Sequence, residues 1–177
     1  VKPCDMKNSD SINEYYYNLG KIQALLYLLG AQDIIPDNLI VIGNCPYIID
    51  CESVVSKKFK HLDSTKISAY LQSSVLETGI LPDWMFNGAN DRSQISSVLF
   101  EFDDSNFHLP KKEGKSYPIT AETLQDLEKG FTDACNFMRA HKLDLLSYIY
   151  SYDFNFMRSR VLLHPTVIYS YILTEMV

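Results

Sequence analysis

The segment from residue 33 to residue 52 constrains the fold of this chain more tightly than any other stretch. It contains two short apolar runs rich in β-branched residues, Leu39–Ile42 and Pro46–Ile49. Gly43-Asn44 lies between them, and such a pair is typical of short hairpin turns. The segment therefore predicts a small antiparallel hairpin, and a hairpin fixes the separation of the polar residues at its two ends.

Three of those polar residues have a spacing with chemical meaning: Asp33 and Asn38 precede the hairpin, and Asp50 follows it. In kinase-type phosphotransferases, an Asp separated by four residues from an Asn accepts the proton of the attacking hydroxyl. The Asn oxygen then holds one magnesium ion, and a later Asp holds the metal that bridges the phosphates. The spacing makes phosphoryl transfer from ATP with Mg²⁺ the first hypothesis. The alternative is that Asp and Asn are turn formers and caps here, as in many loops.

Helical periodicity accounts for most of the remaining chain, so we expect an α+β fold that is mainly helical. Apolar residues recur at helical spacing from Ile12 to Leu29, and Gly30 is placed to end that helix. A second helix should begin after Thr120 as N-cap, with Thr123 in the position of the usual capping-box Glu. The other expected elements are helices over 66–76, 143–150 and 166–176 and an extended segment over 158–163.

The apolar positions expected to face the core in the two long helices are Ile12, Tyr16, Leu19, Ile22, Ala24, Leu25, Leu26, Leu28, Leu29, Leu124, Leu127, Phe131, Ala134, Cys135 and Met138. By contrast, residues 87–118 are polar and rich in Gly and Pro, which predicts an extended excursion from the core. His61, His108 and His141 have no carboxylate or thiol partners at motif spacing, and we expect them to be ordinary residues at the surface or at the boundary of the core. Residues 78–84 should form a turn that buries Trp84.

Composition excludes several classes of function. The net charge of −6 does not favour a nucleic-acid surface, because that surface requires a basic face. The four cysteines form no Cys-x-x-Cys pair and have no His at zinc spacing, so reduced and mostly buried thiols are expected. No signal peptide is present, and no apolar run approaches the ~20 residues of a membrane span. We therefore expect a cytoplasmic protein.

A helix, a loop with an acid, a hairpin with a second acid and then several helices follow the order of a kinase carboxy-terminal lobe. The chain has no Gly-rich strand-loop-strand and no Val-Ala-Ile-Lys-like strand, the features of the amino-terminal lobe. It also starts at Val1 without an initiator Met. The expectation is a piece of a longer protein whose amino-terminal lobe lies upstream.

Three ordered blocks resemble the dehydratase domain of class II lanthipeptide synthetases, the LanM family. Leu29-Gly-Ala-Gln-Asp33, Asn38 and Asp50-Cys-Glu52 are similar to the family's Leu-Gly-Ala-x-Asp-x-His-x-x-Asn and Asp-Leu-Glu. The run from Ser74 to Trp84 is similar to Ser-Val-Leu-x-Thr-Gly-Leu-Leu-Pro-x-Trp. The run from Arg160 to Tyr169 is similar to Arg-x-x-x-Arg-Pro-Thr-x-x-Tyr. Residues 1–177 would thus be a partial dehydratase domain without its amino-terminal lobe and its cyclase domain.

The resemblance implies a two-step reaction on a precursor peptide within a larger synthetase. Mg²⁺-ATP phosphorylates Ser or Thr, and elimination of the phosphate then leaves a dehydroamino acid. Asp33 would deprotonate the hydroxyl, while Asn38 and Asp50 would hold magnesium. Arg160 and Thr166 would serve the elimination, for which Arg can grip a phosphate through two parallel hydrogen bonds. The alternative for this pair is a structural ion pair and a helix cap.

Two departures from the family pattern define the competing hypothesis. Ile35 stands where the family has His, and an aliphatic side chain cannot donate a hydrogen bond to a transferring phosphate. His164 stands where the family has a second Arg, and a His is a pH-dependent phosphate ligand. These residues are consistent with a catalytically degenerate module that binds peptide or nucleotide. A lobe of another small-molecule kinase is a third reading, but it leaves the Thr78–Trp84 block unexplained.

Overall fold

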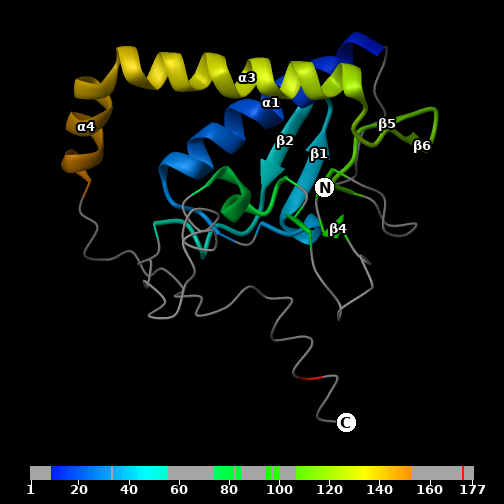
Figure 1. Cartoon of the computed structure of the whole chain (residues 1–177), viewed down its shortest axis with the longest axis horizontal. Helices are drawn as coiled ribbons and strands as arrows, with labels where there is room; N and C mark the ends of the chain where they lie inside the picture. Colours follow the sequence, from blue (N-terminus) through cyan, green and yellow to red (C-terminus); the bar gives the residue numbers. More distant parts are fainter. Residues whose placement is uncertain are drawn as a thin grey trace.

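The computed structural model describes residues 9–32, 34–55, 74–81, 83–84, 95–96, 98–99, 107–152 and 173. The long helix α3 lies across the helix α1, and the β1–β2 hairpin lies on the other side of α1 (Figure 1). The fold is mixed and mainly helical, with small antiparallel sheets, as the sequence predicts. The extended or turn segment expected over 158–163 and the helix expected over 166–176 lie outside the described residues, apart from Leu173, and so do residues 66–73 of the helix expected over 66–76. Residues 75 and 76 of that expected helix belong instead to a 3₁₀ helix that spans Val75–Thr78.

Helix α1 spans Ser9–Leu28 and buries one stripe of its surface. It ends where Gly30 takes a left-handed conformation with φ of 65°. The N–H of Gly30 then bonds to the carbonyl of Tyr27, and the N–H of Ala31 bonds to that of Leu26. This pattern is a Schellman motif, which satisfies the last carbonyls of a helix. The predicted helix and its Gly stop are confirmed, whereas Leu25 and Leu28 lie off the buried stripe and are exposed.

Helices α1 and α3 (Ala121–Ala140) touch backbone to backbone at two glycines. A Cβ atom on Gly20 would overlap the backbone of Leu127, and one on Gly130 would overlap the backbone of Tyr17. In each helix, therefore, a glycine packs directly against the main chain of the other helix. Side chains of any size would force the helix axes apart, so this pair sets the separation of the two longest elements.

Helix α3 begins as predicted, with Thr120 as N-cap. The Thr120 hydroxyl accepts a bond from the N–H of Thr123, and the Thr123 hydroxyl accepts one from the N–H of Thr120. Only Thr123, Leu127 and Gly130 of this helix are buried among the described residues. The expected core position Leu124 is therefore wrong, since it is 47% exposed. Helix α4 (Lys142–Ser151) follows His141 and confirms the predicted short helix.

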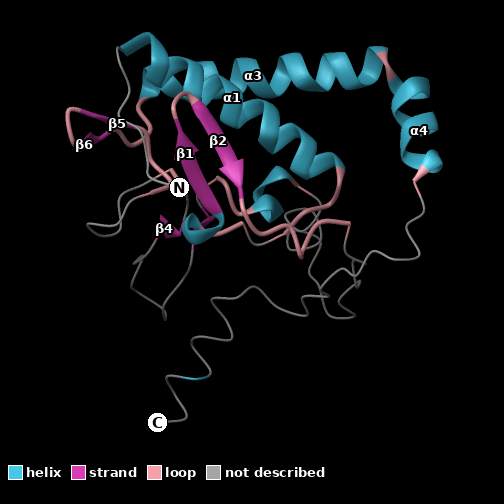
Figure 2. Ribbon diagram, turned by 180° about the vertical axis from the view of Figure 1, so that it is seen from behind, coloured by secondary structure: helices cyan, strands magenta, loops and turns pink. Residues whose placement is uncertain are grey.

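Strands β1 (Leu39–Ile42) and β2 (Cys45–Ile48) form the predicted antiparallel hairpin, with Leu39 opposite Ile48 and Ile42 opposite Cys45. Gly43 takes the left-handed conformation that the turn requires. The side-chain amide of Asn18 on α1 donates to the carbonyl of Asn44 over 3.1 Å. The hairpin turn is thereby tied to α1, and the hairpin lies beside α1 in the views from both sides (Figures 1 and 2).

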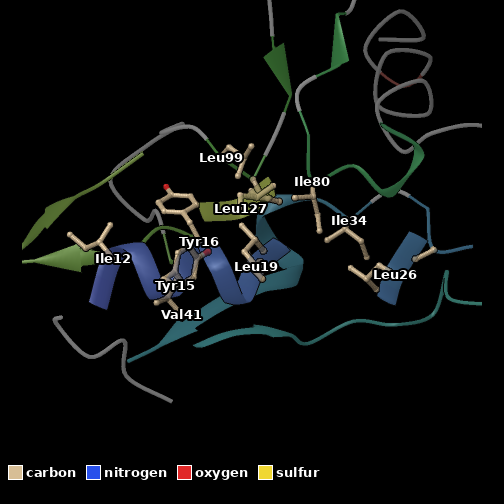
Figure 3. Packing of buried hydrophobic residues seen from close by; sticks show 13 residues of the cluster. Ile12, Tyr15, Tyr16, Leu19, Leu26, Ile34, Val41, Ile80, Leu99 and Leu127 are labelled. Carbon is tan, nitrogen blue, oxygen red and sulfur yellow. The ribbon is translucent and has the colours of Figure 1, made fainter. Parts of the chain in front are cut away.

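Two tyrosines of α1 bind the segment that precedes α3. The Tyr15 hydroxyl donates to the carbonyl of His108, and the Tyr16 hydroxyl donates to that of Tyr117, both over 2.7 Å. Both rings are buried in the core with Leu19 and Leu127 (Figure 3). Burial raises the pKa of both phenols, because the charged phenolate is poorly solvated there.

The prediction that residues 87–118 leave the core is wrong for the part that the structure describes. Val98, Leu99 and Leu109 are fully buried, and His108 is 4% exposed rather than at the surface or at the boundary of the core. Among the described residues of this segment, polar residues from Lys111 to Ser116 form a small hairpin, β5 (Lys111–Lys112) with β6 (Lys115–Ser116). The segment is polar on average over residues 87–118, and this average concealed short apolar runs that pack in the core.

A second small ladder pairs β3 (Asp83–Trp84) with β4 (Ile95–Ser96). The Trp84 side chain, expected to be buried, lies outside the described part of the structure. Of the described cysteines, Cys51 is exposed and Cys45 and Cys135 are half-buried, so the expectation of mostly buried thiols is wrong for these three. Within the described residues, no helix combines the length and apolar character required to cross a membrane.

Candidate functional site

The site predicted from the sequence is divided between described and undescribed residues. Asn38 and Asp50 are described, at the two ends of the β1–β2 hairpin. Asp33, Arg160 and Thr166 lie outside the described residues, as does His164. The structure therefore describes the two expected magnesium ligands and the backbone on either side of residue 33.

Asn38 ends a short 3₁₀ helix, η1 (Pro36–Asn38), and folds back onto the loop before it. Its side-chain oxygen Oδ1 accepts the N–H of Ile35 over 3.1 Å, and its own N–H donates to the carbonyl of Ile35 over 2.9 Å. These two bonds fix the side-chain torsion of Asn38. Because a carbonyl oxygen has two lone pairs, one remains for a ligand.

Asp50 is brought toward Asn38 by one more hydrogen bond of the hairpin. The N–H of Ile49 donates to the backbone carbonyl of Asn38 over 2.9 Å, which extends the ladder by one step beyond Leu39 and Ile48. Asp50 is the next residue and is exposed. Its Oδ1 accepts the N–H of Glu52 over 3.1 Å, which orients the carboxylate from within its own turn.

The segment around Ile34 is held by a second 3₁₀ helix, η2 (Val75–Thr78). The N–H of Ile34 donates to the carbonyl of Thr78 over 2.9 Å. Gly79 follows with φ of 81°, and a Cβ atom there would lie 2.7 Å from the carbonyl oxygen of Ile34. Thr78 and Ile34 are both buried, so this contact belongs to the core.

The turn after Asp50 is tied to the same loop from the other side. The Ser53 hydroxyl donates to the carbonyl of Gln32 over 2.5 Å. The N–H of Val55 donates to the carbonyl of Leu29 over 3.0 Å. The backbone is thus anchored at Gln32 by the turn after Asp50 and at Ile34 by η2, one residue on either side of Asp33.

The donor chemistry of Asn38 and Asp50 fits Mg²⁺. An amide oxygen and a carboxylate are oxygen ligands of the type that Mg²⁺ prefers, and this ion keeps several waters rather than needing a complete protein cage. Within the described residues, no group of three or more His, Cys, Asp or Glu side chains is arranged to hold a metal ion.

Comparison with known proteins identifies the class of the chain. Residues 1–111 match the family described as Domain of unknown function (DUF4135). The chain belongs to this family. The match covers the hairpin, Asn38, Asp50 and the Thr78-Gly79 contact, and it ends before α3.

A similar protein is the lacticin 481/lactococcin biosynthesis protein LcnDR2 of Lactococcus lactis subsp. lactis. It is 26% identical over 209 residues, which cover 98% of this chain and 22% of that protein. The chain thus spans about a fifth of the length of this relative. Together with the family match, this confirms the resemblance to class II lanthipeptide synthetases.

Sequence reasoning predicted Asn38 and Asp50 as magnesium ligands, which stays a prediction, and it missed Ser53, Thr78 and Gly79 as residues that hold the loop. Thr78 and Gly79 were present in the second family block, yet their contact with Ile34 is made through backbone atoms. A sequence can suggest that a glycine adopts a positive φ, but it does not show which residue packs against that glycine. Ser53 carried no signal, because a single serine in a polar stretch resembles any surface residue.

Proposed function

We propose that this chain acts in lanthipeptide biosynthesis as part of a synthetase that dehydrates Ser and Thr residues of a precursor peptide. The observation that supports the proposal is the hydrogen bond from the Ile49 N–H to the Asn38 carbonyl, which brings Asn38 and the next residue, Asp50, to the base of one hairpin in a chain of this family. The kinase-like lobe and the metal-binding hairpin are part of the same proposal. The reaction takes place in the cytoplasm, together with the rest of the synthetase.

In the first step, the hydroxyl oxygen of a peptide Ser or Thr attacks the γ-phosphorus of ATP. The bond between that phosphorus and the oxygen bridging to the β-phosphate breaks, and ADP leaves. Asp33 accepts the hydroxyl proton and orients the attacking oxygen. Asn38 and Asp50 would hold Mg²⁺, which would supply charge neutralisation at the phosphates.

In the second step, a base removes the α-proton of the phosphorylated residue. The Cβ–O bond breaks, a Cα=Cβ double bond forms, and inorganic phosphate leaves. Arg160 binds the departing phosphate through its guanidinium group, and Thr166 assists by a hydroxyl hydrogen bond. Over both steps the peptide loses one water molecule and ATP becomes ADP and phosphate.

The test is the mass of a candidate precursor peptide after co-expression with the full-length protein. Wild-type protein should yield peptide that has lost one or more waters. Asp33→Asn should yield unmodified peptide, because the attacking hydroxyl keeps its proton. Arg160→Ala should accumulate phosphopeptide, because elimination fails after phosphorylation. Unmodified peptide with the wild-type protein, with ATP and peptide both present, would contradict the proposal.

A second candidate function is a catalytically degenerate module that binds peptide or nucleotide. Ile35 and His164 favour it, because each replaces a residue that would contact phosphate in the family pattern. The two candidates differ in turnover and agree in binding. Titration of the full-length protein with Mg²⁺-ATP does not separate a degenerate module that binds nucleotide from an active synthetase, so peptide modification is the deciding measurement.

A further inference from the structure

Ser53 is a buried hydroxyl residue that belongs to neither the expected magnesium ligands nor the expected catalytic residues. It is 7% exposed, and its hydroxyl donates to the carbonyl of Gln32 over 2.5 Å. Gln32 immediately precedes Asp33 in the chain, and Ser53 follows Asp50 by three residues. One side chain therefore joins the segment after the second acid to the segment before the first.

The turn that carries Ser53 is itself well fixed. The N–H of Glu52 bonds to the Asp50 carboxylate, and the N–H of Val54 bonds to the carbonyl of Cys51 over 3.1 Å. Val55 then adopts a left-handed conformation with φ of 59°, which a β-branched residue rarely accepts. Such a conformation persists where the surroundings determine it, and here the N–H of Val55 is bound to Leu29.

The opposite side of the loop is held independently by the bond between Ile34 and Thr78. Before residue 33, the N–H of Ala31 bonds to the carbonyl of Leu26, and the Ser53 hydroxyl holds the carbonyl of Gln32, the residue adjacent to Asp33. Without Ser53, the held backbone would end one residue further from Asp33, and catalytic groups require positions held to a fraction of an ångström.

We propose that the Ser53 hydroxyl is a positioning residue for phosphorylation, which sets the loop that carries Asp33 relative to Asp50. The inference rests on the proposed function. In this proposal, Ser53 affects the orientation of the attacking hydroxyl of the peptide. It does not contact the nucleotide directly. Loss of the hydroxyl should therefore lower kcat for phosphorylation more than it changes KM for ATP.

The experiment uses purified precursor peptide and purified full-length protein. It measures the rates of phosphorylation and dehydration of the peptide at varied concentrations of Mg²⁺-ATP. The variants are Ser53→Ala, which removes the hydroxyl, and Ser53→Thr, which keeps it. Ser147→Ala is the matched control, because Ser147 is an exposed serine on α4. Thermal unfolding of each variant shows whether the fold is retained.

Ser53→Ala should lower kcat about 10- to 100-fold, the usual effect of removing a residue that orients a ligating or catalytic group. Its KM for ATP should stay within a few-fold of wild type, Ser53→Thr should recover most of the rate, and Ser147→Ala should match wild type. Wild-type kcat in Ser53→Ala would overturn the inference. So would a loss that follows the fraction of unfolded protein, since the role would then be structural. A wild-type protein that modifies no peptide would overturn the proposed function itself.

Discussion

The N–H of Ile34 donates a 2.9 Å hydrogen bond to the carbonyl of Thr78, and this bond joins two segments that are distant in the sequence. Both residues are buried, and Gly79 packs directly against the backbone of Ile34. The Thr78-Gly79 pair is therefore a support for the loop before Asn38. This explains in physical terms why the two segments occur together in one domain.

Gly79→Ala should destabilise the fold strongly. The substitution places a Cβ 2.7 Å from the carbonyl oxygen of Ile34 and imposes φ of 81° on an L side chain. The left-handed conformation costs ~1–2 kcal/mol and overpacking adds ~1–3 kcal/mol, so we expect a loss of about 3 kcal/mol. Chemical denaturation of the full-length protein measures it.

Gly114→Ala is the matched control for Gly79→Ala. Gly114 has φ of 75°, but a Cβ there meets nothing within 4 Å. It should therefore lose only the conformational part, ~1–2 kcal/mol. Equal losses in the two variants would show that contact with Ile34 contributes nothing.

Gly20→Ala and Gly130→Ala should both destabilise the protein, which reverses the usual sign for a helix. In an uncrowded helix, Ala in place of Gly stabilises by ~0.5–1 kcal/mol. Here the new Cβ would overlap the backbone of Leu127 or of Tyr17. We expect each variant to lose at least ~2 kcal/mol, measured as the free energy of unfolding. A gain in stability from either variant would contradict the close backbone contact of α1 and α3.

The elements were predictable where local chemistry alone decides them. Gly30 ends α1 because its left-handed conformation satisfies the carbonyls of Leu26 and Tyr27, and Thr120 caps α3 with Thr123. These signals lie within a few residues of each other. Leu124 was assigned to the core wrongly, because periodicity gives the helix but not which of its faces meets a neighbour.

The site was predictable only in part for a related reason. Spacing around the hairpin predicted Asn38 and Asp50 as magnesium ligands, and that role stays a prediction; the structure places both residues at the base of the hairpin. The contacts of Ser53 with Gln32 and of Thr78 with Ile34 join segments through backbone carbonyls, and any residue has a carbonyl. Such partners leave no compositional trace in a single sequence.

Tyr15 should contribute to the free energy of unfolding in a way that is lost at alkaline pH. Burial, followed by the charge of Tyr16, raises the pKa of Tyr15 above the ordinary value of 10.0. The folded state favours the neutral phenol, so this contribution is fully present below pH 10 and is lost as pH rises from 10 toward the folded pKa. Tyr15→Phe removes this pH-dependent contribution to stability. It also removes the hydrogen bond that the Tyr15 hydroxyl donates to the carbonyl of His108.

At neutral pH, Tyr15→Phe should cost ~1–2 kcal/mol, and its difference from wild type should shrink above pH 10. Unfolding by denaturant at a series of pH values measures both. Tyr150→Phe is the control, because Tyr150 is 82% exposed and its change should lie within ~0.5 kcal/mol. A Tyr15→Phe deficit that stays constant to strongly alkaline pH would contradict the burial of the neutral phenol.

Gln23→Met should leave stability unchanged or raise it. Gln23 is 1% exposed, and its side-chain Nε2 has no hydrogen-bond partner among the described residues. An unpaired buried amide costs ~1–3 kcal/mol, while Met has nearly the same length and no polar atom. Thermal unfolding should show an equal or higher midpoint. A lower midpoint would show that Gln23 bonds to a group outside the described residues.

Ile35→His separates the active synthetase from the degenerate module. In an active enzyme another group already stabilises the transferring phosphate, so adding a donor at position 35 should change phosphorylation only a few-fold. In a degenerate module the missing donor limits turnover, and restoring it should raise the rate ~100- to 1000-fold. The backbone at this position is fixed by the bond from Ile35 N–H to Asn38, and Ile35→Leu controls for the change in side-chain packing. The assay is phosphopeptide and dehydrated peptide formed per unit time by the full-length protein. Because the proposed function is an active synthetase, we expect the few-fold result, and a large gain confined to the His variant would favour the degenerate module instead.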